Sequence, residues 1–453
     1  MTRSWKTLAA IGAAAVTVLA GCAPSGAVSP AASPAASVAA TASAAAASAA
    51  ATSAAPSPSA PNDHVLRIAM GSPGEAQIRV WDAVAKQYHA AHPETKVEMN
   101  YQQDDLYETI GLQQLLAGRN SPDIYFEWTG ERLRTRLTDG YAADITDVFK
   151  TGPLAGLFDD ATLAQYTVDG KVVMVPYSAD VTNVLWYNKA ILASAGIQPP
   201  ATWTDLLAAC DALRAKGIIP IASGNKDLWP AGNWLGHMAS RVIGEDLYAK
   251  TLSGTGKFST PEWEAAFGHI KELADHKCVN ETANSIDDNA GAQLFFQEKA
   301  AMHPIGSWLV SWALDEAPDL DFDYVNLPSM PDGKGNQNSV IGVATGYVIN
   351  AKSPKQKEAA EFMALLNNAA NVKALITAEV TPLAKSASAG EKIDSRSTKL
   401  TQLLNEAPAI VLPPDTGYNL KTADALYTAI AAVLGGKSSP TAALAEMDRK
   451  LNR

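Results

Sequence analysis

This 453-residue sequence has only three cysteines and seven histidines, and none of its apolar runs is long enough to cross a membrane. It lacks the short motifs that mark P-loop nucleotide binding, a G-x-S-x-G serine nucleophile or an H-E-x-x-H zinc site. We therefore expect no metal and no cofactor. Asp and Glu outnumber Lys and Arg by 47 to 36, and the net charge is −11. This acidity argues against a nucleic-acid partner, because binding to phosphate groups needs clustered Lys and Arg side chains.

The N-terminus has the form of a bacterial lipoprotein signal. A basic start precedes an apolar segment from Leu8 to Leu19, and small residues stand directly before Cys22. Cleavage before this cysteine would free its amine and leave its sulfur to carry lipid. We expect residues 1–21 to be a signal peptide and Cys22 to be the lipidation site. The alternative is an ordinary signal peptide that happens to end near a cysteine.

Residues 22–62 form a linker after the lipidated cysteine. From Ala23 to Pro61 the chain is almost entirely Ala, Ser, Pro and Thr and carries no charge, so it lacks the large apolar side chains that a packed core needs. The remaining chain, from about residue 63, is long enough for two lobes. Within it, Cys210 and Cys278 either form a disulfide or remain two buried thiols.

The start of this body predicts an α/β fold. Strands are expected at 65–70, 97–101 and 123–126, with helices from about 75 to 92 and from 105 to 118 between them. Such alternation favours a mostly parallel sheet covered by helices on both faces. Ligands bind beyond the carboxyl ends of the strands in these sheets, so loops 71–75 and 127–131 should face a site. Further helices are expected at 202–216, 261–276, 354–377, 420–434 and 441–451, a strand at 218–222, and a loop over 224–234.

An ordered series of short motifs resembles one family. The motifs are Pro122–Phe126, Val175–Tyr177, Leu185–Lys189, Phe296–Met302, Gly306–Trp308 and Gly342–Ile349. In this order they resemble the extracellular carbohydrate-binding proteins of bacterial ABC importers, which are solute-binding proteins of the maltose-binding type. Each motif alone is weak, but the series covers nearly the whole body.

The resemblance implies a two-lobed periplasmic-binding-protein-like fold with a ligand cleft between the lobes. Three crossing segments would form the hinge, near 176–183, 302–306 and 350–354. The N-terminal lobe would comprise 63–178 and 303–350, and the C-terminal lobe 181–301 and 354–453.

The resemblance also implies a receptor and not an enzyme. A monomer anchored at the outer face of the cell membrane would capture a sugar, expected to be an oligosaccharide, and deliver it to the permease of an ABC importer. Two alternatives remain open. One is a receptor of the same fold for a non-carbohydrate solute. The other is a surface-anchored glycan hydrolase, since paired carboxylates occur in any chain with this many acids.

Aromatic rings are the first candidates for sugar contacts, because they present flat apolar faces to the C–H groups of a sugar ring. Trp81 and Trp186 lie in apolar stripes and are assigned to the core. In the resembling family a tryptophan at the position of Trp308 stacks on a sugar; the alternative is hinge packing. The other aromatic candidates lie in expected loops or at a strand end: Trp128, Trp229, Trp234 and Tyr418.

Polar candidates are side chains that can take paired sugar hydroxyls. The resemblance favours Asp180, at the first crossing; a hinge-turn residue is the alternative. Glu127 ends the third strand, and its alternative is a salt bridge to Arg132 or Arg134. Weaker ligand-binding candidates complete the set: Asn183, Asn233 and Glu75.

Overall fold

A computed structural model describes residues 63–387 and 394–453 of the chain. The expected signal peptide (1–21), Cys22 and the linker (22–62) lie outside the described residues. Among the helices that the structure describes, none combines the length and the apolar character needed to cross a bilayer.

The first sheet begins with the predicted alternation of strands and helices. Strand β1 (Val65–Gly71) pairs in parallel with both β2 (Lys96–Gln102) and β3 (Ile124–Trp128). Helix α1 (Glu75–Ala91) joins the first two strands and buries an apolar stripe that includes Trp81 and Tyr88. The strands expected from the sequence are therefore present in the expected order.

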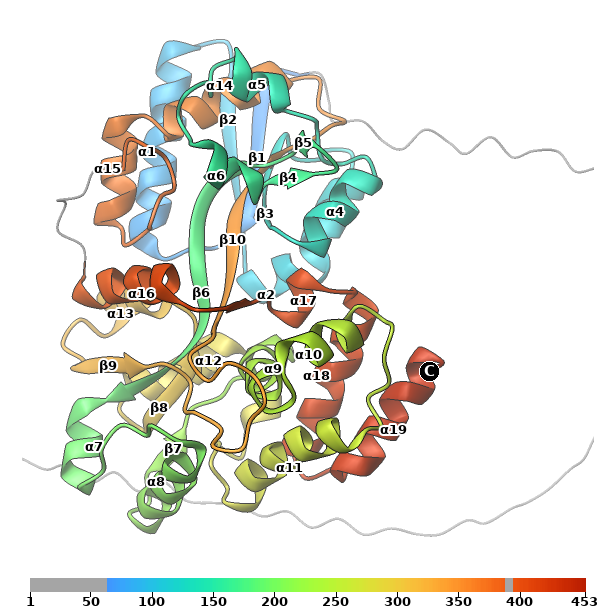
Figure 1. Ribbon diagram of the computed structural model, residues 1–453. Helices are drawn as coiled ribbons and strands as arrows, with labels where there is room; N and C mark the ends of the chain where they lie inside the picture. Colours follow the sequence, from blue (N-terminus) through green and yellow to red (C-terminus); the bar gives the residue numbers. More distant parts are fainter. Residues whose placement is uncertain (1–62, 388–393) are drawn as a thin grey trace, which may run out of the picture. The chain divides into compact units, whose positions relative to one another are not determined.

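Helices cover both faces of this sheet (Figure 1). One buried cluster contains Leu66, Trp81 and Phe362, and a second contains Tyr107, Tyr125 and Val348. We call these two clusters together the first core. The other elements before residue 175 are α2 (Asp104–Leu106), the π-helix η1 (Tyr107–Gly111), α3 (Leu112–Ala117), α4 (Glu131–Thr138), α5 (Thr146–Lys150), α6 (Asp160–Ala164), β4 (Thr167–Val168) and β5 (Lys171–Val172).

Strand β6 (Val175–Asn188) connects the two halves of the molecule. Its first half pairs antiparallel with β10 (Val340–Ile349), and its second half pairs with β8 (Ala300–Ile305) and β9 (Phe322–Val325). Figure 1 shows β6 and β10 running side by side from one half to the other. The order is β2-β1-β3-β10-β6-β8-β7, with β7 (Ile219–Ile221) at the end and β11 (Ile410–Val411) beside β10. The sheet is thus mixed beyond β3, and not mostly parallel as predicted.

A third buried cluster, which we call the second core, surrounds the later half of β6. It contains Trp186, Trp234, Phe267 and Leu426, all nearly or fully buried. Its helices come from two separate parts of the chain, which the sheet brings together: α7 (Lys189–Ala195), α8 (Trp203–Ala215), α9 (Trp229–Ile243), α10 (Glu245–Leu252), α11 (Pro261–Asp275), η2 (Ala283–Ser285), α12 (Asp288–Phe296), α13 (Leu309–Glu316), α18 (Leu420–Leu434) and α19 (Pro440–Leu451).

The second core includes residues that the resemblance assigned to the N-terminal lobe. Leu309 and Phe322 lie in this core, although 303–350 was expected in the other lobe. The reason is strand pairing, because β8 and β9 both bond to the second half of β6. The chain therefore does not cross near 302–306.

The first core likewise includes residues assigned to the C-terminal lobe. After β10 the chain continues into α14 (Gln356–Leu366) and α15 (Ala369–Thr377), whose Phe362 and Leu375 are buried beside Trp81 of α1. The chain next passes between cores after Ala384, and Leu400 of α16 (Ser395–Glu406) belongs to the second core. The described chain therefore changes core within β6, within β10 and between Ala384 and Leu400, and not at 350–354.

Two predicted helices differ from those observed. The expected helix 354–377 is broken where Asn368 caps the start of α15 with its side chain. The expected helix 105–118 contains the π-turn η1, which widens the helix at Tyr107–Gly111. Residue hydrophobicity places both segments correctly but does not reveal these interruptions.

Cys210 of α8 and Cys278, just after α11, form a disulfide with a Cα–Cα distance of 5.1 Å. Both cysteines are fully buried in the second core. This resolves the two alternatives that the sequence left open.

The disulfide predicts a specific loss of stability. Replacing both cysteines with serine should lower the free energy of unfolding by about 2–4 kcal/mol, because the bond closes a loop spanning 68 positions. Denaturant unfolding monitored by circular dichroism measures the change. A reductant should destabilise the wild type and leave the double variant unaffected. Equal stability of the two proteins under oxidising conditions would contradict the assignment.

Candidate functional site

A cavity of about 240 Å³ lies between the two cores. Gly71–Gly74 and Trp128 line it, so both loops predicted to face a site lead to this cavity. Its other walls come from the crossing strands β6 and β10, from residues 307–312, and from α16 and the short helix α17 (Pro414–Gly417). Residues from both cores therefore meet around one space.

Trp308 provides the central aromatic surface of the cavity. Its indole is half-buried and lies against Gly306, where any Cβ would collide with the ring. The ring of Trp229 is 6.0 Å away between centroids and tilted by 54°. Trp312, one helical turn later, also lines the cavity. The second core thus contributes three tryptophans to one wall.

The first core contributes Trp128 and Phe126, both from the end of β3. Their rings meet edge to face with centroids 4.9 Å apart. The guanidinium of Arg132 stacks on the Trp128 ring at 4.5 Å from its centroid. Trp128 is consequently held by neighbours on its own core while it lines the cavity.

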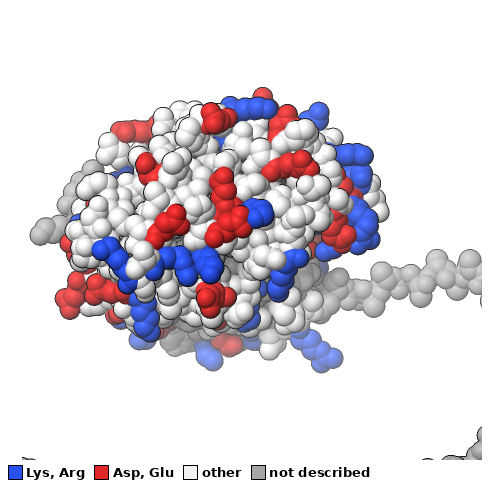
Figure 2. Space-filling view, turned by 90° about the horizontal axis from the view of Figure 1, so that it is seen from below, with Lys and Arg blue, Asp and Glu red and all other residues white. Residues whose placement is uncertain are grey.

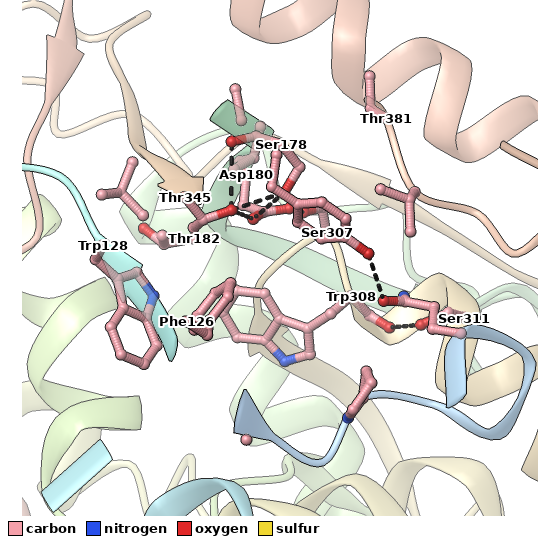
Figure 3. A pocket seen from close by; sticks show the side chains of 18 of the residues that line it. Phe126, Trp128, Ser178, Asp180, Thr182, Ser307, Trp308, Ser311, Thr345 and Thr381 are labelled. Carbon is pink, nitrogen blue, oxygen red and sulfur yellow. Dashed lines mark hydrogen bonds between the residues drawn. The ribbon is translucent and has the colours of Figure 1, made fainter. Parts of the chain in front are cut away.

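Asp180 lies on β6 and is surrounded by hydroxyl groups. Ser178 Oγ donates to Oδ2 at 3.1 Å, Ser307 Oγ donates to Oδ1 at 3.2 Å, and Thr345 Oγ1 donates to Oδ2 at 3.5 Å. Figure 3 shows this group on one side of the Trp308 indole. Burial raises the pKa of the Asp180 carboxyl, and the hydroxyl hydrogen bonds counteract this only in part.

Asn233 of α9 also lines the cavity. Its Oδ1 accepts a 2.5 Å hydrogen bond from the hydroxyl of Tyr427, whose oxygen accepts the backbone N–H of Asp415 at 3.1 Å. Because Oδ1 is engaged, the amide orientation is fixed and its nitrogen remains the available donor. Five of the ten predicted ligand-binding residues therefore line this cavity: Trp308, Asp180, Trp128, Trp229 and Asn233.

Glu127 does not line the cavity but forms a buried ion-pair network. Its Oε1 accepts from Arg132 Nε at 3.1 Å, and its Oε2 accepts from Arg136 Nε at 2.7 Å. Burial raises the pKa of Glu127, but the two arginine charges outweigh it and hold that pKa below its usual value. The salt bridge considered as the alternative is thus formed, with Arg136 in place of Arg134.

The other four candidates lie outside the cavity lining. Trp234 is buried in the second core, because 229–243 forms helix α9 and not the expected loop. Asn183 is 1% exposed, and Glu75 is exposed in the first turn of α1. Tyr418 packs edge to face on Tyr248, with centroids 5.7 Å apart.

Several lining residues were not predicted. Trp312 stands four positions after Trp308, which on a helix places both on one face, and this spacing was a readable signal. Ser307 lies inside the quoted Gly306–Trp308 motif, and Asp415 lies in the segment from which Tyr418 was chosen. Ser178, Thr182 and Thr345 line the cavity because of strand register, which periodicity alone does not specify.

Comparison with known proteins gives consistent matches. Residues 72–373 match the profile of the family described as bacterial extracellular solute-binding protein. The chain is 23% identical over 292 residues to an uncharacterised ABC transporter extracellular-binding protein of Pyrococcus horikoshii, covering 63% of this chain and 64% of that protein. It is 25% identical over 300 residues to a multiple sugar-binding protein of Streptococcus mutans, covering 59% of this chain and 69% of the relative.

A solved structure described as a chitin oligosaccharide binding protein superposes with a TM-score of 0.76 at 22% identity. The match covers 86% of this chain and 99% of that one. At this identity the likeness shows the two-lobed fold alone.

The Glu127 network predicts a large and pH-dependent effect on stability. Glu127→Gln should lower the free energy of unfolding by about 3 kcal/mol, because Arg132 and Arg136 lose a buried counter-charge. The folded-state pKa of Glu127 lies below its unfolded value of about 4.3. The ion pair therefore stabilises the fold above that pH, and the difference between wild type and variant should shrink as pH falls below it.

Glu131→Gln is the matched control for this prediction. Glu131 also pairs with an arginine, Arg134, but at 3.7 Å and on the surface, so its loss should cost less than about 1 kcal/mol. Urea unfolding at neutral and acidic pH measures both variants. Equal effects at Glu127 and Glu131 would contradict the buried network.

Proposed function

The chain belongs to the bacterial extracellular solute-binding protein family, and from this we propose that it is a lipid-anchored receptor that captures a sugar, an oligosaccharide, and delivers it to an ABC importer. The observation that carries the proposal is the cavity between the cores. It combines the indoles of four tryptophans with hydroxyl, amide and carboxylate groups. Indoles stack on the apolar faces of sugar rings, and the polar groups pair with their hydroxyls.

Relatives support the choice of ligand. The matched Streptococcus mutans relative is named for binding multiple sugars, and the matched structure for binding chitin oligosaccharides. The match covers less than two thirds of the length of the Pyrococcus horikoshii relative. The ligand and the transport partner of this chain are therefore proposals.

The two-core arrangement supports capture by closure. Trp128 comes from the first core, and Trp229 and Trp308 come from the second. A sugar that contacts both sets binds the closed arrangement more tightly than an open one, so it shifts the population toward closure. A permease in the cell membrane would then receive the closed, loaded form.

Calorimetric titration with di- to tetrasaccharides tests the proposal. We expect 1:1 binding with a dissociation constant in the micromolar range or tighter, corresponding to about −8 kcal/mol, and recovery of the sugar intact. Reducing ends released during the titration would instead identify a glycan hydrolase. Folded protein that binds no sugar would indicate a receptor for another solute.

Trp308→Ala should weaken sugar binding at least about tenfold, because it removes the central stacking surface. Trp308→Phe is the matched variant, since it keeps an aromatic face and should retain most of the affinity. Calorimetry gives the dissociation constants, and thermal unfolding confirms that both variants fold. Unchanged affinity in the alanine variant would remove Trp308 from the site.

Lipid anchoring is tested at Cys22, which follows small residues at the end of the apolar N-terminal segment. Cys22→Ser should abolish incorporation of radiolabelled palmitate and move the protein from the membrane fraction to the medium. Cys278→Ser is the control and should leave labelling unchanged, because that cysteine is buried in a disulfide. Palmitate labelling that persists without Cys22 would contradict the anchor.

A further inference from the structure

The cavity differs in charge from the surface around it. Its lining includes five carboxylates, from Asp104, Glu108, Asp180, Glu379 and Asp415, and among the described lining residues there is no Lys, Arg or His. On the face of the molecule shown in Figure 2, by contrast, acidic and basic side chains are interspersed. A cleft lined by one sign of charge selects its ligand by charge.

Two of these carboxylates have partners within the protein: one forms an ion pair and the other accepts backbone hydrogen bonds. Glu108 Oε1 lies 3.6 Å from Arg132 Nη1. The carboxylate of Glu379 accepts the backbone N–H of Asp394 at 2.9 and 3.1 Å. The charge of Glu108 is therefore compensated within the protein, and Glu379 is committed to holding the start of α16.

Asp180 receives hydrogen bonds only from neutral hydroxyl groups. Ser178, Ser307 and Thr345 surround it, and no Lys, Arg or His among the described residues forms an ion pair with it. Hydroxyl donors compensate a buried negative charge less than a cation does. This carboxylate thus faces the cavity without a counter-charge.

Asp415 is the second carboxylate to consider, and Arg132 and a hydrogen bond with Tyr427 offset its buried charge only in part. Its Oδ1 is buried and makes no hydrogen bond within the described part of the chain. Arg132 is the cation that acts on it, but that guanidinium already pairs with Glu127 and Glu108. A buried acceptor without a donor is costly unless a ligand supplies one.

Thr182 provides an independent indication of a missing ligand group. It is 5% exposed, lines the cavity, and its Oγ1 has no hydrogen-bond partner among the described residues. It lies two positions after Asp180 on β6, at the irregularity where the register with β10 shifts, and both residues line the cavity. A carboxylate and a hydroxyl acceptor are thereby presented together to the cavity.

We propose that the preferred solute is a sugar bearing a basic amine, whose ammonium is received by Asp180 and Thr182, with Asp415 as a second acidic group. An ammonium has donors for several acceptors and supplies the counter-charge that the lining lacks. A neutral sugar meets the same groups with weaker hydrogen bonds, and an acidic sugar is repelled. This inference rests on the proposed sugar-binding function and deepens it.

Matched disaccharides that differ mainly in charge test the inference. Calorimetry would compare glucosamine, N-acetylglucosamine, glucose and glucuronate disaccharides, together with the corresponding galacto-configured sugars, at neutral pH. We expect the amine-bearing disaccharide to bind at least about tenfold more tightly than its neutral counterpart, and the uronate to show no binding. The preference should weaken with added salt.

Variants locate the amine. Asp180→Asn should remove most of the preference for amine over neutral sugar, and Asp415→Asn should reduce it. Asp332→Asn is the control, because it makes the same change in charge at an exposed residue outside the lining and should leave the ratio unchanged. If one of the two variants folds poorly, the other still measures how the ratio of the two affinities, for amine-bearing and for neutral sugar, depends on an acidic group.

Each result decides the inference. Neutral or acidic sugars binding as tightly as aminated ones would overturn it while leaving the receptor function in place. An amine preference that persists in Asp180→Asn would also overturn it. A folded protein that binds no member of the series would count against both this inference and the proposed function.

Discussion

One strand, β6, is the constraint on which the rest of the structure depends. Its first half bonds to β10 within the first core, and its second half bonds to β8 and β9 within the second. Asp180 and Thr182 lie where these partners change, so they face the space between the cores. The pairing along β6 also determines which half of the molecule each later strand belongs to. Strand β10 pairs with the first part of β6, whereas β8 and β9 pair with the second part.

Polar groups near this junction are treated in two different ways. One group is a network of two carboxylates and two guanidiniums, formed by Glu108, Glu127, Arg132 and Arg136. The guanidinium of Arg132 in this network also stacks on the Trp128 ring. Elsewhere in the cavity lining, Asp180 receives hydrogen bonds only from hydroxyl groups. The network, in which negative and positive charges are paired, stabilises the wall of the cavity. Asp180, which has no cationic partner among the described residues, can interact with a ligand.

Local pattern predicted much of the fold, and the resemblance to the solute-binding family is confirmed. The helix expected from about 75 to 92 is α1, and the helix expected at 420–434 has the observed bounds of α18. Long-range pairing was not predictable from the sequence. The residues around Phe322 do not indicate that its strand pairs with β6, and those around Phe362 do not indicate that its ring packs on Trp81. The site followed the same division. Trp308 lines the cavity, whereas Glu127 and Trp234 do not, because their burial depends on partners distant in sequence.

The second core has a consequence for the order in which the chain can fold. Val181 and Leu185 belong to the same buried cluster as Leu444 and Met447, so helices late in the chain complete a core that starts early. Such non-local packing is slow to form, and the segments between remain unburied until their partners arrive. Apolar surface of the early segments therefore stays exposed until the last two helices, α18 and α19, have been made.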